Sequence, residues 1–233
     1  MTVDPSGPIL LVIDTATSRV VVARGDLDGQ LGDQTSWAAG YRHGETLLPS
    51  LEHLLEPVGG RSAIGAIVVG TGPGAFTGLR VGIATAKGLA HGLGCPVVGI
   101  STGAALLDAA SVGAAGATVP AGRLVLLLPA GPSDRVVVRD GLAPELLPGG
   151  RDPELAPDEL MVAVDLDGRA PADALERGRA AHDGLAAAHL RLGASRLAHG
   201  ERDDLERLVP DYVTLPRGVT TATGEVAWSR DRP

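Results

Sequence analysis

Short apolar runs, separated by turn residues, open the chain. Residues 9–13 are continuously apolar, which is typical of a strand buried on both faces. Residues 20–23 and 32–38 predict two further strands, and residues 26–30 supply turn chemistry between them. The chain therefore opens with a predicted β-meander.

Helical periodicity follows the meander. One helix face within residues 43–56 carries Leu47, Leu48, Leu51, Leu54 and Leu55. Pro49 lies in that stripe, so the regular helix starts near Pro49 or the proline occupies its first turns. Strands at 66–69 and 96–100 then alternate with helices at 77–91 and 101–110. This alternation requires crossover connections and predicts a layered, largely parallel α/β sheet.

The second half carries weaker signals. Strands are predicted at 124–128, 135–138 and 160–164, a loop at 142–157 and a helix at 175–199. Residues 112–122 are rich in Ala and Gly and predict a linker. We therefore expect an N-terminal lobe at 1–110 and a smaller C-terminal lobe at 111–233, with a frayed tail from about 220.

The charge of the chain bears on its partners. The formal net charge is -8, and Lys87 is the only lysine. Direct binding of a nucleic acid needs clustered Lys and Arg, which an acidic chain supplies poorly. The composition therefore argues against a chain that holds a nucleic acid by itself.

The cellular compartment can be inferred from the cysteine and the apolar runs. Cys95 is the single cysteine and lies in an apolar stretch, which favours a reducing compartment and a buried thiol. The N-terminus lacks the basic and apolar pattern of a signal peptide, and the longest apolar runs are only strand-sized. These features predict a cytoplasmic protein without a membrane contact.

The first candidate for chemistry is the turn after the opening strand. It contains the polar residues Asp14, Thr15, Thr17 and Ser18. A carboxylate and hydroxyls at a tight turn between buried strands could face a phosphate or a metal-bound water. The alternative is an ordinary hairpin turn, since turns favour the same residue types.

The second candidate is the glycine-rich loop between a predicted strand and helix. Its distinctive positions are Gly72, Pro73, Gly74, Phe76, Thr77, Gly78 and Arg80. A phosphate-binding P-loop is excluded because no Lys followed by Ser or Thr comes after the last glycine. A dinucleotide fingerprint also fails, since no acidic residue lies about 20 positions further on. The loop could accept an anion at the helix N-terminus, or simply make the turn with Thr77 as the helix cap.

A strip of small residues follows on the helix at 77–91. It consists of Gly78, Gly82, Ala86 and Ala90, which recur every four residues. Each interior glycine costs a helix about 1 kcal/mol relative to alanine, so a close backbone approach is indicated. The approaching element could be the protein's own sheet or a helix of a second chain, and the sequence leaves both open.

The six histidines form no recognisable metal or catalytic motif. No HExxH pattern occurs, and His182 and His189, seven residues apart, lack a third ligand. No Ser-His-Asp constellation can be placed either. We expect surface histidines, no metal and no catalytic residue.

Several segments together resemble the TsaB (YeaZ-like) proteins of the glycoprotease M22-like family. The resemblance is carried by residues 13–18 (IDTATS), 42–45 (RHGE), 72–82 (GPGAFTGLRVG), 84–90 (ATAKGLA) and 98–102 (VGIST). It covers about the first 105 residues. In the second half only residues 164–168 and 210–212 match, and faintly.

The resemblance implies an actin-like (ASKHA, ribonuclease H-like) α/β fold of two lobes, the second one reduced. It also implies a non-catalytic subunit required for N6-threonylcarbamoyladenosine (t6A37) on tRNA, which binds and activates the catalytic subunit TsaD. The metal-binding HxxxH of TsaD would fall at Thr102 and Leu106, neither of which can replace a histidine.

The family role implies a set of contacts. Its interface for TsaD, or for a homodimer without TsaD, would use the two helices with Leu47, Leu51 and Leu54 on one and Gly78, Gly82, Ala86 and Ala90 on the other. A TsaE-like ATPase is a further expected partner, and tRNA would be reached only through the complex. No cofactor is expected, although weak nucleotide binding stays open.

Two enzymatic alternatives remain from the sequence. An ASKHA-type ATPase or kinase would use residues 14–18 as a phosphate hairpin, but residues 165–168 lack the glycine-threonine pattern of a second phosphate loop. An M22-like peptidase would need a nucleophile or a metal centre, and the sequence offers neither.

Overall fold

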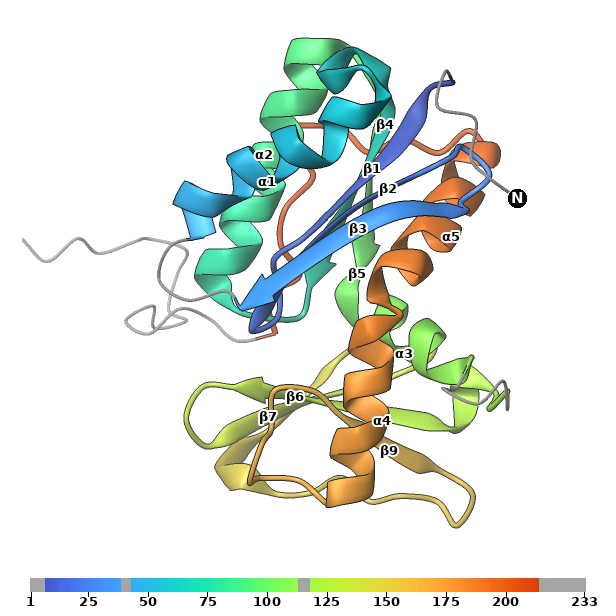
Figure 1. Ribbon diagram of the computed structural model, residues 1–233. Helices are drawn as coiled ribbons and strands as arrows, with labels where there is room; N and C mark the ends of the chain where they lie inside the picture. The colour runs from blue at the N-terminus through green and yellow to red at the C-terminus, as the bar shows by residue number, and fades with distance from the viewer. Residues whose placement is uncertain (1–6, 39–42, 113–117, 214–233) are drawn as a thin grey trace, which may run out of the picture.

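The computed structural model describes residues 7–38, 43–112 and 118–213, which form two α/β lobes (Figure 1). The first lobe contains a five-stranded sheet in the order β3-β2-β1-β4-β5. Its strands are β1 (Ile9–Asp14), β2 (Arg19–Gly25), β3 (Leu31–Ala38), β4 (Ile64–Gly72) and β5 (Val97–Ser101). The strands β1, β2 and β3 pair antiparallel, as a meander does, whereas β4 and β5 run parallel to β1.

The second lobe contains a smaller sheet in the order β8-β7-β6-β9. Its strands are β6 (Leu124–Ala130), β7 (Asp134–Arg139), β8 (Glu145–Leu147) and β9 (Leu160–Ala163). The strand β6 pairs antiparallel with β7 and parallel with β9. The helix α4 (Ala172–Asp183) covers this sheet through its contacts with β9.

Helices cover both faces of the first sheet. The helices α1 (His43–Leu55) and α2 (Phe76–Leu93) pack on one face and share one apolar core with it. The other face is covered by α3 (Thr102–Ser111) and α5 (Leu185–Ala198), whose apolar residues form a core that continues into the second sheet. Short 3-10 helices lie at Glu56–Val58, Gly60–Ala63, Ala121–Arg123 and Pro148–Gly150. Figure 1 shows α4 and α5 following one another from the second lobe to the first.

Packing explains the positions of β1 and α5 in the first lobe. All six residues of β1 are buried, as the continuous apolar run predicts for a strand covered on both faces. The helix α5 lies so close to the sheet that a Cβ on Gly193 would be 2.4 Å from Cγ2 of Val68. Because aromatic residues are scarce, the core is filled with aliphatic side chains at close spacing.

Some sequence predictions were wrong in detail. The predicted helix at 175–199 is two helices that meet at Gly184, and the predicted loop at 142–157 contains β8. The helix α1 begins at His43, so Pro49 lies inside it, and α2 is preceded by Ala75 as its cap residue instead of Thr77.

The chain also returns to the first lobe near its C-terminal end. The backbone N–H groups of Asp203 and Asp211 donate to the carbonyls of Val97 and Thr71, on β5 and β4. The division into lobes at 1–110 and 111–233 therefore remains a proposal, because residues after 200 bond to strands of the first lobe. The predicted frayed tail from about 220 lies outside the described residues.

Candidate functional site

The turn between β1 and β2 lies where the two lobes meet. Asp14 ends β1 and is fully buried. Its carboxylate accepts hydrogen bonds from the N–H of Ala16 (2.8 Å), the hydroxyl of Thr102 (2.7 Å) and Nε2 of His189 (2.7 Å). Three elements therefore converge on one carboxylate, since Thr102 comes from α3 and His189 from α5.

These contacts set the charge state of Asp14. Burial alone would raise its pKa, but the hydrogen bond and charge of His189, with the bonds from Ala16 and Thr102, hold the pKa of Asp14 below its usual value. The carboxylate also packs against Gly70, where a Cβ would lie 2.1 Å from Oδ2. Asp14 is thus an ionised group enclosed by its own chain.

Thr15 connects the same turn to α2. Its hydroxyl donates to the carbonyl of Gly78 at 2.7 Å. A Cβ on Gly78 would lie 2.1 Å from the Thr15 carbonyl oxygen, and one on Gly82 would lie 2.3 Å from the Thr15 hydroxyl. The two glycines therefore allow the helix to approach the turn.

This close approach corrects the predicted partner interface. All seven residues assigned to it are buried inside the chain, namely Leu47, Leu51, Leu54, Gly78, Gly82, Ala86 and Ala90. They pack against the first sheet and the turn after β1. Of the two options that the sequence left open for the small residues, burial against the protein's own sheet is the one found.

The outer faces of the same helices are exposed. Leu48 on α1 is 52% exposed, and Ala84, Gly88 and His91 lie on the exposed side of α2. A Cβ on Gly88 would meet nothing within 4 Å. Two small residues of α2, Ala84 and Gly88, thus face outward, away from the buried strip.

The remaining residues of the turn are bound by the second lobe. The hydroxyl of Thr17 lies 2.7 Å from Nε2 of His182 on α4. The N–H of Ser18 donates to Oδ2 of Asp165 at 2.6 Å, and its hydroxyl donates to Oδ1. Asp165 follows β9, so these contacts join the two lobes directly.

The expectation of surface histidines was wrong for two of the six. His182 and His189 are both buried and bond to turn residues. Because the Thr17 hydroxyl donates to the carbonyl of Arg19, the Nε2–H of His182 is the donor to Thr17. Burial lowers the pKa of His182, with nearby Asp165 and Arg19 acting in opposite directions.

The glycine-rich loop rests on this turn. The N–H of Ala75 donates to the carbonyl of Ala16 at 2.7 Å, and a Cβ on Gly74 would lie 2.1 Å from the same oxygen. Gly72 has a φ of 109°, which a residue with a side chain rarely adopts. The loop is therefore fitted to the Asp14–Ser18 turn through its backbone.

An aromatic cluster continues from the loop to the C-terminal segment. The rings of Phe76 and Tyr212 lie 5.0 Å apart, and the guanidinium of Arg80 lies 3.8 Å from the Phe76 ring centre. Nε of Arg80 also donates to the Tyr212 hydroxyl at 2.9 Å. Residues that are distant in sequence thus meet at the start of α2.

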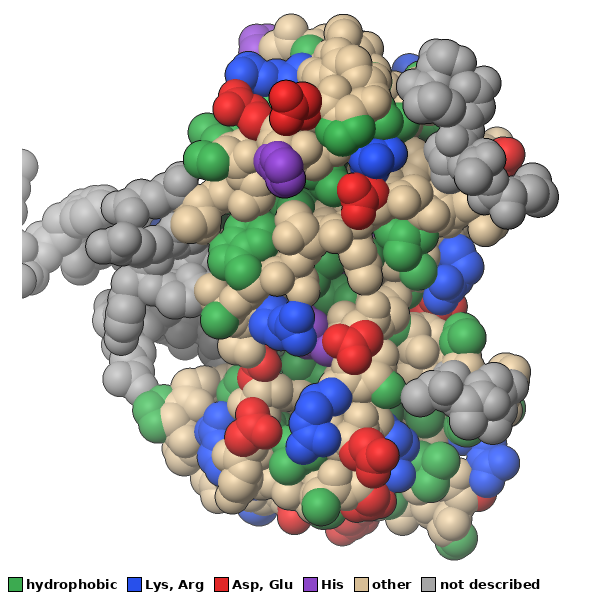
Figure 2. Space-filling view, viewed as in Figure 1, with side chains coloured by type: hydrophobic (Ala, Val, Ile, Leu, Met, Phe, Trp, Pro, Cys, Tyr) green, Lys and Arg blue, Asp and Glu red, His purple; other side chains and the backbone are tan. Residues whose placement is uncertain are grey.

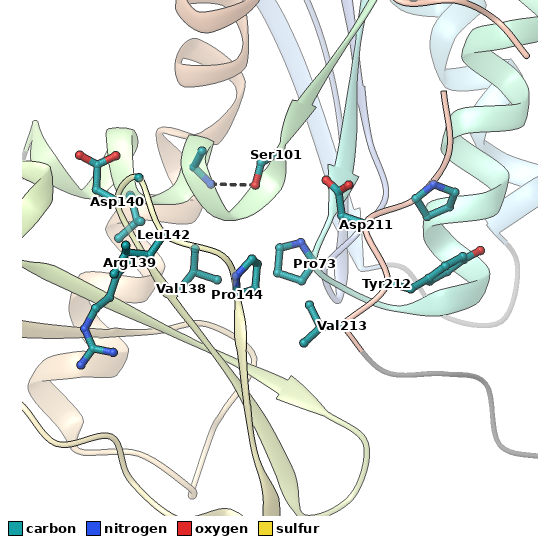
Figure 3. A pocket seen from close by; sticks show the side chains of 14 residues that line it. Pro73, Ser101, Val138, Arg139, Asp140, Leu142, Pro144, Asp211, Tyr212 and Val213 are labelled. Atoms are coloured by element: carbon teal, nitrogen blue, oxygen red, sulfur yellow. Dashed lines mark hydrogen bonds between the residues drawn. The ribbon is translucent and has the colours of Figure 1, made fainter. Parts of the chain in front are cut away.

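A cavity of about 750 Å³ lies beside this cluster (Figure 3). Pro73, Ser101, Val138 and Tyr212 are among its lining residues. The Ser101 hydroxyl caps α3 by accepting from the N–H of Ala104, as the dashed line in Figure 3 shows. The side chain of Arg139 points away from the cavity toward the second sheet.

No metal centre is found in the parts of the chain that the structure describes. There, no group of three or more His, Cys, Asp or Glu side chains could hold an ion. Thr102 and Leu106, which the resemblance places at the histidines of the TsaD motif, are fully buried. No helix among the described residues is long and apolar enough to cross a membrane.

Four residues of this site were missed or left without a role by the sequence reasoning. They are Thr102, Asp165, His182 and His189. The seven-residue spacing of the two histidines would place them on one helix face, but His182 lies on α4 and His189 on α5, which are separate helices. Their partners could not be found, because 165 and 175 residues separate them from Thr17 and Asp14.

The chain is similar in sequence to proteins of tRNA modification. Residues 37–152 match the family model of TsaD, tRNA N6-adenosine threonylcarbamoyltransferase. An uncharacterized protein of Mycobacterium leprae is 40% identical over 116 residues, which are 48% of this chain and 31% of that protein. The tRNA threonylcarbamoyladenosine biosynthesis protein TsaB of Escherichia coli is 38% identical over 94 residues, which are 40% of each protein. The chain therefore covers less than half the length of these relatives.

The fold is matched over a longer stretch. The solved structure of YeaZ from Pseudomonas aeruginosa superimposes with a TM-score of 0.67 at 25% identity and covers 88% of this chain and all of that chain. This likeness includes the second lobe, where the sequence resemblance is faint. The expected α/β fold of two lobes is confirmed as the fold of YeaZ.

Proposed function

Because the chain belongs to the TsaB/YeaZ family, within the wider family of TsaD and the M22 glycoproteases, we propose that it is a non-catalytic subunit for t6A37 formation on tRNA. In this role it binds a TsaD-like subunit and holds that subunit in its active form. The reaction itself takes place on the partner.

One observation carries this proposal. By the resemblance, the histidine pair of TsaD falls at Thr102, which donates to Asp14, and at Leu106, which is part of the apolar core. An imidazole pair at these positions would need room and a path for a metal ion. Asp14, the acidic residue that Thr102 contacts, is already paired with His189. The part of the fold that would hold a metal in TsaD is thus packed as structural core here.

The outer faces of α1 and α2 supply a surface for the partner. The exposed positions Leu48, Ala84 and Gly88 combine an apolar side chain with places where a foreign helix backbone can approach closely. The buried strip on the other side of α2 fixes the helix on the sheet and so makes this surface rigid. The same surface would serve a homodimer when the TsaD-like subunit is missing.

Further partners follow from the same role. A TsaE-like ATPase would join the complex, and tRNA would be bound by the complex rather than by this chain. On the face shown in Figure 2, Lys and Arg side chains lie interspersed with Asp and Glu side chains, which suits contact with proteins better than contact with a phosphate backbone. We place the complex in the cytoplasm.

The test is association with the TsaD-like subunit of the same organism, measured by pull-down and analytical ultracentrifugation. We expect Gly88→Arg to weaken association at least about tenfold, because a long charged side chain would fill the space for the partner helix. Gly122→Arg is the matched control, since Gly122 also has nothing within 4 Å of its Cβ position but lies in the second lobe. Equal association of both variants with the TsaD-like subunit would refute the proposed surface.

A further inference from the structure

The strand β3 is the open edge of the five-stranded sheet in the first lobe. It pairs with β2 on one side, and among the described residues no strand pairs with its other side (Figure 1). The opposite edge strand, β5, is covered by the returning chain, because the N–H of Asp203 donates to the carbonyl of Val97 and Oδ2 of Asp203 accepts from the N–H of Gly99. An edge strand whose backbone groups stay open is a template for pairing with another strand.

The hydrogen bond of the Gln34 N–H shows which backbone groups point to the open edge. This N–H donates to Oδ1 of the neighbouring Asp33 at 2.8 Å, so it does not take part in the pairing with β2. Backbone groups along an antiparallel pair alternate in direction, so those of Ser36 also point outward, whereas those of Thr35 point to Val22 on β2. The bond to Asp33 lies in an exposed position and can be exchanged for a bond to another strand.

The sequence of β3 lacks most of the features that keep an edge strand from pairing. It contains no proline and no lysine, and its bulge lies opposite Arg24 and Gly25 at its beginning, which leaves residues 33–38 regular. Its only charged side chain, Asp33, lies 3.5 Å from Arg24. Two copies of β3 would therefore meet without an unbalanced charge, although the net charge of the whole chain is -8.

We propose that β3 is a self-association surface, on which β3 of a second copy pairs antiparallel about a two-fold axis at Thr35. In this register Gln34 lies opposite Ser36 of the second copy, and both positions offer outward N–H and C=O groups. An axis at Gln34 or at Ser36 would leave more of the outward groups of the strand unpaired. The register also places Asp33 opposite Trp37 of the second copy, which keeps the two carboxylates apart. Thr35 faces Thr35 of the second copy, a favourable cross-strand pair.

This surface is separate from the one proposed on α1 and α2. The exposed positions Ala84 and Gly88 lie on α2, which covers one face of the sheet, whereas β3 forms the edge of the sheet. Pairing through β3 uses backbone groups, and contact through α2 uses a helix surface. A substitution can therefore remove one contact and leave the other, so self-association through β3 does not depend on the proposed function.

The first test is sedimentation velocity over a concentration series, with Gly88→Arg in every variant so that the α2 surface does not contribute. We expect the Gly88→Arg chain to form a dimer as its concentration rises. Ser36→Pro removes an N–H that β2 does not use, which edge strands tolerate, and should weaken self-association at least about tenfold. Ser36→Ala is the matched control, since it loses the hydroxyl that accepts from Arg19 but keeps the N–H, and should associate undiminished. A monomeric Gly88→Arg chain, or equal association of the two Ser36 variants, would overturn the proposal.

The second test fixes the register without a proline. Thr35→Cys, with Cys95→Ala to remove the natural thiol, should form a disulfide between two copies under mild oxidation. A pair of this kind places the two Cβ atoms about 4.5–5.5 Å apart, close to the spacing that a disulfide needs. Asp33→Cys is the matched control on the same face of β3, because the proposed axis separates its two copies by about 13 Å along the strand. No disulfide from Thr35→Cys, or an equal yield from Asp33→Cys, would overturn the proposed pairing.

Discussion

His189 and Asp14 form a fully buried pair whose Nε2 and Oδ2 atoms lie 2.7 Å apart, although 175 residues separate them in sequence. The pair joins α5, which returns from the second lobe, to the end of the first strand. Among the described residues Nδ1 of His189 has no hydrogen-bond partner, so in this part of the chain the ring is held through Nε2. The contact therefore fixes the position of α5 on the first sheet.

Removal of one partner of this pair should be costly. We expect His189→Leu to lower the free energy of unfolding by about 3 kcal/mol, because Asp14 would stay buried with its charge unpaired. Chemical denaturation measures the change. His199→Leu, on an exposed position of the same region, should cost less than about 0.5 kcal/mol. A loss for His189→Leu no larger than that of the control would contradict the role of the pair.

Alanine substitutions of a buried and an exposed glycine of α2 should change the stability of the chain in opposite directions. Gly78→Ala places a Cβ 2.1 Å from the Thr15 carbonyl oxygen, so we expect a loss of about 1–3 kcal/mol from overpacking. Gly88→Ala adds a Cβ in open space and should raise stability by up to about 1 kcal/mol through helix propensity. Thermal and urea unfolding of the two variants check the signs. Stabilisation by both would mean that the helix does not pack on the turn as described.

The His182 ring should make stability depend on pH. Burial lowers its pKa below the usual 6.5, so the unfolded chain takes up a proton more readily than the folded one. The contribution of neutral His182 to the free energy of unfolding should therefore be complete above pH 6.5. It should decrease as the pH falls below 6.5. Denaturation between about pH 5 and 7.5 measures this slope, and His182→Gln should reduce it. An unchanged slope in the variant would assign the effect to other groups.

The sequence was sufficient for the architecture where patterns are local. The buried run at 9–13 and the leucine stripe of α1 predicted elements that the structure contains, because burial on both faces leaves a continuous apolar run and burial of one helix face leaves a periodic one. The helix at 175–199 was predicted without its break at Gly184, since Ala and Leu on both sides carry the same helical propensity.

The candidate site could be predicted only in part. Asp14 and Ser18 stood out as turn residues, but the groups that occupy them, His189 and Asp165, belong to the other half of the chain. Long-range pairs leave no spacing rule in a single sequence. The small residues of α2 indicated a close approach correctly, yet Gly82 does not reveal by itself whether the approaching group is Thr15 of the same chain or a second protein.

The most direct test of the account is t6A37 formation in a purified system with tRNA, the TsaD-like subunit and the other components of the modification. We expect the TsaD-like subunit to form the modified adenosine only when this chain is added. This chain without the TsaD-like subunit should form none. Equal product with and without this chain, or product from this chain in place of the TsaD-like subunit, would contradict the assignment of a non-catalytic partner.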